Sequence, residues 1–205
     1  MEGGNLTQLV TGRRGNLSED FCRWSLYQVA LGLKAMHDRN VLHRDIKSDN
    51  VLCRPDGQIK IADMGFSVFL TEQQDYRMTK KGTPSWISPE MCQGVAYSKE
   101  VDVWAFGCFA FELATGDPPF SGFGRDYDRL FHAIVHDPVP QIPQRPNMPW
   151  SAAFVDFAGK CLLKDSKQRW SIDQLLGHEF MQNAEASRVG WCQDYAAWAA
   201  ETKSK

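Results

Sequence analysis

The sequence predicts one compact domain of the mainly α (α+β) class. Two long stretches, residues 17–36 and 98–113, carry apolar residues at helical spacing and are long enough to form core helices. Between them, short apolar runs at 51–53 and 58–62 flank Pro55-Asp56-Gly57, a turn sequence that predicts a β-hairpin. A chain of 205 residues, 43% of them hydrophobic, can bury a sizeable core.

The first long helix is predicted to begin after Ser18, whose side chain can cap it. Glu19 and Asp20 follow, and their negative charge suits the positive end of a helix. Apolar residues cover most of the circumference as far as Met36, which indicates a helix that is buried on nearly all sides. A shorter helix around residues 6–10 is expected before it.

The rest of the chain predicts further helices and one long irregular segment. Residues 66–90 are polar and show no clear period. Helices are expected at 126–136, 153–163 and 172–176, with a proline-rich connector between the first two. The tail, residues 183–205, is rich in Ala and Trp and is expected to be helical. It would either dock on the domain or bind a partner, and the sequence does not separate these two possibilities.

Composition excludes several classes of function. The formal net charge is −2, and no basic patch suggests a nucleic-acid partner or a membrane surface. The six cysteines form no C-x-x-C pair, which indicates reduced thiols in a cytoplasmic protein. The longest apolar stretch, 101–113, contains Asp102 and Glu112 and is too short for membrane insertion. His132, His136 and His178 share no metal-ligand pattern, so we interpret them as surface or core residues.

The chemistry of this chain is concentrated in residues 43–50, which read H-R-D-I-K-S-D-N. Asp45 can accept a proton from an attacking hydroxyl, and Lys47 can offset the charge of a phosphate in transfer. Asn50 supplies a neutral oxygen for Mg²⁺. The alternative is a solvated loop of mixed charge, which further motifs downstream disfavour.

Four linked motifs follow in order: D-M-G at 63–65, G-T-P at 82–84, S-P-E at 88–90 and D-V-W-A-F-G at 102–107. Together with residues 43–50 they resemble the large lobe of a eukaryotic protein kinase. The sequences of these motifs are most similar to the Ste group of serine/threonine kinases, in particular the branch that small GTPases activate. The resemblance covers about residues 1–181.

The resemblance implies a fold and an activity. The fold would be a protein-kinase-like large (C-terminal) lobe with short β hairpins at the catalytic cleft. Residues 1–182 would form a partial kinase domain and residues 183–205 a helical tail. The activity would be transfer of the ATP γ-phosphoryl group to protein Ser/Thr hydroxyls, with ATP and Mg²⁺ as cofactors. The expected partners are protein substrates and an upstream kinase or small-GTPase pathway.

The resemblance also assigns roles within the site. Asp45 would accept the substrate proton, Lys47 would stabilise the γ-phosphoryl group, and Thr83 would hydrogen-bond both and mark serine/threonine specificity. Asn50 and Asp63 would bind Mg²⁺. For the nucleotide, Met1 would lie at the hinge and Leu52 would lie beneath the adenine.

A second set of residues would regulate or support the site. Thr79 aligns with an activating phosphosite, and Arg44 would pair with the charge of about −2 that phosphate brings. The alternative for Thr79 is an ordinary surface threonine. Asp102 would accept hydrogen bonds from the backbone of the catalytic loop. An ion pair between Glu90 and Arg169 is expected to be structural.

The printed residues contain neither G-x-G-x-x-G nor V-A-I-K. We therefore expect a fragment of an active kinase that begins at the hinge, lacks the small lobe and binds ATP weakly. A non-catalytic docking or scaffold module is the alternative, and a coding sequence for the missing motifs upstream would distinguish the two. A pseudokinase is a third interpretation, for which Met64 in place of the usual Phe and Ser88 in place of Ala are mild indications.

Overall fold

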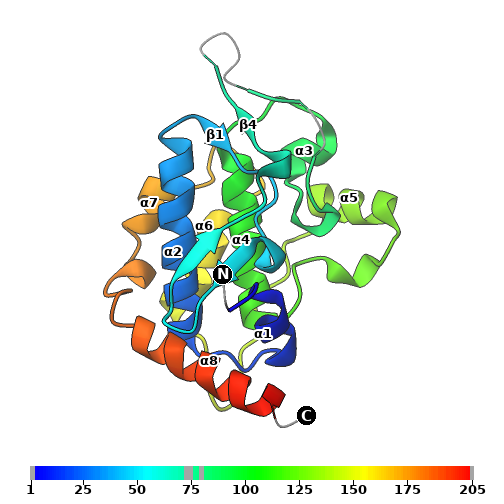
Figure 1. Ribbon diagram of the computed structural model, residues 1–205. Coiled ribbons are helices and arrows are strands. Elements are labelled where there is room, and N and C mark those ends of the chain that lie inside the picture. Colours follow the sequence, from blue (N-terminus) through cyan, green and yellow to red (C-terminus); the bar gives the residue numbers. More distant parts are fainter. Residues whose placement is uncertain (1–2, 72–75, 79–80, 204–205) are drawn as a thin grey trace.

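The computed structural model describes residues 3–71, 76–78 and 81–203, so the expectations for Met1 and Thr79 lie outside the described residues. It is a mainly helical domain with two small β-sheets (Figure 1). The helices and strands are α1 Thr7–Gly12, α2 Glu19–His37, β1 Val41–Leu42, β2 Val51–Cys53, β3 Ile59–Ile61, β4 Val68–Phe69, α3 Pro89–Gln93, α4 Glu100–Thr115, α5 Tyr127–His136, α6 Ala152–Cys161, α7 Ile172–Leu176 and α8 Arg188–Lys203.

Helix α4 runs through the middle of the domain and packs against both α2 and α6 (Figure 1). Its aromatic side chains Trp104, Phe106 and Phe109 are fully buried, and Phe106 meets Phe157 of α6 edge-on at 5.9 Å between ring centroids. Gly116 ends the helix in the left-handed region with a φ of 91°, which glycine adopts without steric cost. This apolar axis gives the neighbouring loops a rigid base.

Helix α2 begins as predicted, because the Ser18 hydroxyl accepts a hydrogen bond of 3.0 Å from the backbone N–H of Phe21. The prediction that this helix is buried on nearly all sides holds for most of its circumference but fails at Leu31. The Leu31 side chain is 41% exposed, since α4, α8 and β3 pack against other faces of the helix. The apolar residues of α2 cover more of its circumference than the neighbouring elements do, so the sequence pattern overstated the burial of the helix.

The strands form two antiparallel pairs on either side of the catalytic loop. The predicted hairpin is present, with Leu52 of β2 opposite Lys60 of β3. The pairing of β1 with β4 was not predicted, because Val41 and its partner Phe69 are far apart in the chain. Residues 43–50 leave β1 and enter β2, so both sheets hold the ends of this loop.

The tail docks on the domain, which is one of the two possibilities left open for it. Trp191 of α8 is fully buried, stacks on Phe21 at 5.3 Å between ring centroids and donates a 3.0 Å hydrogen bond to Ser25. Asp194 accepts a 2.9 Å hydrogen bond from the backbone of Ser18. Helix α8 therefore covers α2 at the base of the domain (Figure 1).

The six cysteines are free thiols, and all except Cys192 are buried. Burial raises the pKa of the Cys53 thiol to about 11, so it stays protonated at neutral pH. In the described part of the chain, no helix is long and apolar enough to cross a lipid bilayer.

Candidate active site

The catalytic loop is held from below by a buried carboxylate of α4. Asp102 is fully buried and accepts hydrogen bonds from the backbone N–H groups of His43 and Arg44, at 2.9 and 2.7 Å. The His37 imidazole lies 2.9 Å from the same carboxylate. These are the backbone contacts expected of Asp102, and they fix the path of the chain just before Asp45.

His43 links the loop to the end of β3. Its Nε2 lies 3.0 Å from the carbonyl oxygen of Ala62, which can only accept, so Nε2 carries the proton. The other nitrogen, Nδ1, is then free to accept from the backbone N–H of Asp45 at 3.3 Å. The imidazole is fully buried and therefore positions two parts of the site in one tautomer.

A second buried carboxylate supports the loop, and the sequence analysis missed its role. Glu112 of α4 accepts hydrogen bonds from the Ser48 hydroxyl and from the Ser48 backbone N–H, the latter at 3.1 Å. Burial raises its pKa to about 7, although these hydrogen bonds act in the opposite direction. The available signal was an acidic residue inside an apolar run, which the sequence analysis used only as an argument against a membrane span.

The carboxylate of Asp45 lies at the centre of a cluster of donors. Its Oδ1 accepts from the backbone N–H and the hydroxyl of Thr83, at 2.9 and 2.6 Å. Its Oδ2 lies 3.2 Å from the ammonium of Lys47 and accepts from the side-chain amide of Asn50 at 2.8 Å. The Lys47 ammonium also donates to the Thr83 hydroxyl. The structure thus brings three further predicted residues together around the Asp45 carboxylate.

This cluster keeps Asp45 ionised. The carboxyl is only 3% exposed, and burial by itself raises its pKa. The hydrogen bond from Thr83, the charge of Lys47 and the amide of Asn50 outweigh that effect, so the pKa is held below its ordinary value. A buried carboxylate that remains charged is a strong hydrogen-bond acceptor for an incoming hydroxyl.

Asn50 and Asp63 offer oxygen atoms close to this cluster. The Asn50 amide nitrogen donates to the backbone oxygen and to Oδ2 of Asp45, both at 2.8 Å, which leaves Oδ1 without a partner among the described residues. Asp63 follows Ala62, whose N–H donates to the Asn50 carbonyl at 2.8 Å. One Asp63 oxygen accepts from Gly65 at 3.0 Å. Amide and carboxylate oxygens suit a hard cation such as Mg²⁺.

The D-M-G segment itself is exposed. It forms one short 3₁₀ turn that begins after Asp63, and the Met64 side chain is 54% exposed. Leu52, predicted to lie beneath the adenine, is half-buried in the middle of β2. This edge of the domain presents apolar side chains to solvent beside the polar cluster.

Arg44 reaches the start of residues 66–90, which the resemblance makes the activation segment, and also Tyr97, which follows that segment. Its backbone has a φ of 67°, and its guanidinium donates to the Phe66 carbonyl at 2.7 Å and to the Tyr97 hydroxyl at 3.1 Å. The left-handed conformation turns the side chain away from the buried loop and toward residues 66–97. Thr79, its predicted phosphorylated partner, lies outside the described residues.

The predicted ion pair between Glu90 and Arg169 is present and buried. Two guanidinium nitrogens lie 2.7 and 3.1 Å from the two carboxylate oxygens, and the 2.7 Å nitrogen also donates to the Glu100 carbonyl. The pair ties α3 to the loop before α7. Ser88, just before Glu90, is fully buried, and its hydroxyl has no hydrogen-bond partner among the described residues.

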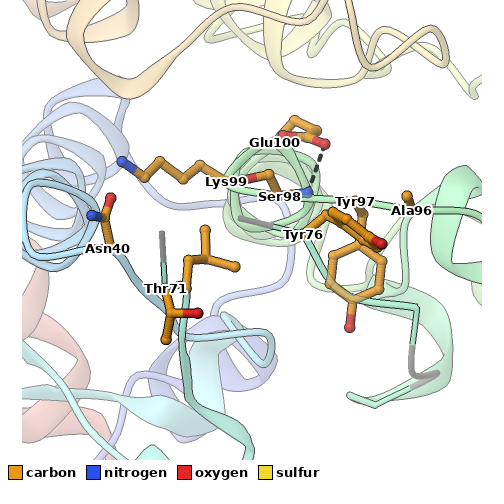
Figure 2. A pocket seen from close by; sticks show the side chains of 9 residues that line it. Asn40, Thr71, Tyr76, Ala96, Tyr97, Ser98, Lys99 and Glu100 are labelled. Atoms are coloured by element: carbon orange, nitrogen blue, oxygen red, sulfur yellow. Dashed lines mark hydrogen bonds between the residues drawn. The ribbon is translucent and has the colours of Figure 1, made fainter. Parts of the chain in front are cut away.

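A hollow of about 460 Å³ lies beside the activation segment and away from the Asp45 cluster. Figure 2 shows Lys99 extending toward Asn40 on one side and the rings of Tyr76 and Tyr97 on the other. Neither Asp45 nor Asp63 lines it. Tyr97 connects it to the catalytic loop, because its hydroxyl accepts a 3.1 Å hydrogen bond from Arg44.

Comparison with known proteins gives a consistent result. The profile of the protein kinase domain matches residues 1–181. The chain is 36% identical to myosin-IIIa of Homo sapiens over 91% of its own length, 34% identical to serine/threonine-protein kinase CLA4 of Candida albicans over 89%, and 36% identical to serine/threonine-protein kinase pak-1 of Caenorhabditis elegans over 90%. It spans only 12%, 18% and 31% of the lengths of these relatives.

Proposed function

Because this chain belongs to the protein kinase family, among serine/threonine kinases of the Ste group, we propose that it transfers the ATP γ-phosphoryl group to serine and threonine hydroxyls of proteins. One observation carries the proposal. The buried carboxylate of Asp45 is kept ionised between Thr83, Lys47 and Asn50. This arrangement suits an acceptor for the proton of a substrate hydroxyl.

The proposed roles follow from the contacts. Asp45 orients the substrate hydroxyl and accepts its proton. Lys47, already 3.2 Å from Asp45, stabilises negative charge on the phosphoryl group as it moves between oxygens. Thr83 contacts both side chains and so positions the base and the cation relative to each other. Catalysis of this kind depends mainly on positioning and electrostatics.

The residues present fit a nucleotide-bound Mg²⁺ ion. Asn50 Oδ1, which has no partner among the described residues, and the carboxylate of Asp63 supply the oxygen ligands, and Leu52 lies on the strand next to them. When bound, Mg-ATP supplies the phosphoryl group and shields its charge. Met1 remains part of the proposal for the adenine site, although it lies outside the described residues.

Regulation by phosphorylation belongs to the same proposal. Arg44 contacts Phe66 at the start of the activation segment and Tyr97 after its end, so a phosphate on Thr79 that reached the guanidinium would link the segment to both contacts. An upstream kinase or a small-GTPase pathway would supply this signal, and cytoplasmic protein substrates would receive the phosphoryl group.

A non-catalytic docking module is the second candidate function. The exposed side chains of Met64 and Phe69 favour it, because apolar groups beside a polar cleft suit contact with another protein surface. The two candidates differ in one requirement. Only phosphoryl transfer needs the acidic oxygens of Asp45 and Asp63.

Titration calorimetry with Mg-ATP tests the nucleotide site first. We expect weak binding by this chain and a loss of at least about tenfold in affinity for Asp63→Asn, which removes one negative ligand. Transfer of labelled phosphate to serine, threonine and tyrosine peptides tests the chemistry. Asp45→Asn should keep Mg-ATP binding and lose about hundredfold or more in transfer rate.

Asp128→Asn is the matched control, because Asp128 is an exposed carboxylate on α5 and remote from the cluster. It should behave as the parent in both measurements. Absence of binding at millimolar Mg-ATP, or binding that Asp63→Asn leaves unchanged, would contradict the kinase proposal and support the docking module.

A further inference from the structure

Two histidines lie side by side on the outer face of α5. The opposite face of this helix buries Leu130, Ala133 and Ile134. His132 and His136 are both exposed, and their ring centroids are 4.6 Å apart with the ring planes inclined by 46°. Residues four apart on an α-helix project from the same side, one turn above the other. The two imidazoles are therefore held together by the helix itself.

This geometry points to a metal site distinct from the proposed Mg²⁺ site. We propose that His132 and His136 form a two-imidazole chelate for a divalent first-row transition metal, with Zn²⁺ as the reference ion. Neutral imidazole nitrogens are good ligands for Zn²⁺, Cu²⁺ and Ni²⁺, and pairs at this spacing on a helix bind such ions. Hard cations such as Mg²⁺ prefer oxygen ligands instead.

The charges around the pair allow a cation. His136 is the last residue of α5, where the helix dipole presents negative charge to a cation. Asp128 lies one turn before His132, and Asp137 follows His136. The opposing charges are Lys164, which donates to the backbone oxygens of Ala133 and Asp137, and Arg129, which lies over the Phe123 ring.

The protein supplies two ligands and leaves the other positions open. No group of three or more His, Cys, Asp or Glu side chains able to hold a metal is found among the described residues. A bound ion would complete its tetrahedral shell with water. Figure 1 shows α5 at the edge of the molecule, so solvent has direct access to this face.

The pair was not predicted from the sequence, because all three histidines together share no metal-ligand pattern. His178 differs from the other two: it is buried, and its Nε2 lies 3.0 Å from the Asp156 carboxylate. Without it, the spacing H-x-x-x-H on a regular helix is the remaining signal.

Titration calorimetry with ZnCl₂ alone tests the site. The protein must carry no affinity tag, and Cys192→Ser should be the common background because Cys192 is the partly exposed thiol. We expect one equivalent of Zn²⁺ to bind, with a loss of about tenfold to hundredfold in affinity for His132→Ala or His136→Ala, because each leaves a single imidazole. MgCl₂ should produce no binding heat.

Two further measurements make the outcome decisive. Lowering the pH from 7.5 to 5.5 should weaken Zn²⁺ binding by about tenfold or more, because protons compete with the metal for the imidazole nitrogens. In thermal melts without metal, His132→Ala and His136→Ala should have the same melting temperature as the parent. Added Zn²⁺ should raise the melting temperature of the parent alone. A parent dissociation constant weaker than about 1 mM, or single variants that bind Zn²⁺ as the parent does, would overturn the proposal.

Discussion

The catalytic loop and the D-M-G segment carry the two carboxylates of the proposed chemistry, but the domain holds them very differently. Asp45 is almost fully buried, and its loop is fastened to α4 through Asp102 and Glu112. Asp63 is exposed, and within the described residues its carboxylate accepts one hydrogen bond, from Gly65. The domain therefore preorganises the proposed proton acceptor, whereas it leaves the proposed metal ligand to be oriented by the metal or by further contacts.

The largest expected difference between the two regions concerns stability. Asp102→Asn should lower the free energy of unfolding by about 3 kcal/mol, because an amide cannot accept from both loop N–H groups and His37 as a carboxylate does. Chemical denaturation measures this loss. The matched variant Asp63→Asn should cost less than about 1 kcal/mol, since that carboxylate is exposed. Equal losses would show that both segments are held alike.

The second expected effect is a pH dependence of the free energy of unfolding, caused by Glu112, which packs under the catalytic loop. Burial raises the pKa of Glu112 from its ordinary 4.5 to about 7, so between these values the folded protein keeps a proton that the unfolded chain has released. Stability therefore falls as pH rises through this window, by an amount on the order of 3 kcal/mol.

Glu112→Gln should remove this contribution, so the difference in unfolding free energy between parent and variant should change with pH only between about 4.5 and 7. Denaturation curves at several pH values measure that difference. Glu179→Gln, at an exposed site, is the control and should follow the parent. If the parent and Glu112→Gln depend on pH in the same way, Glu112 is not the group responsible.

The smallest expected effect lies in the D-M-G segment. Met64→Phe should change the free energy of unfolding by no more than about 0.5 kcal/mol, because the side chain is 54% exposed and has room for the ring. The same exchange at Met91, which is buried in α3, should cost about 1–3 kcal/mol through overpacking. A large loss at Met64 would mean that this segment is packed as tightly as the catalytic loop.

Several features could be predicted from the sequence because they depend on neighbouring residues. Ser18 caps α2, Pro55-Asp56-Gly57 makes the turn between β2 and β3, and Asp126 caps α5 within the predicted range. The order of polar motifs was sufficient to predict the kinase family, which the comparisons confirm. Helix caps, tight turns and motif spacing all act over a few residues, so the printed order contains most of the necessary information.

Other features were decided by tertiary packing. Only the fold brings Glu112 to Ser48, pairs β1 with β4, leaves Leu31 exposed on α2 and separates His178 from the two histidines of α5. Each depends on which surfaces meet across tens of residues, and the same side chain is buried or exposed according to its neighbour. The sequence alone therefore determined the local elements and the chemical groups, whereas the tertiary structure determined which of those groups are buried, charged and in contact.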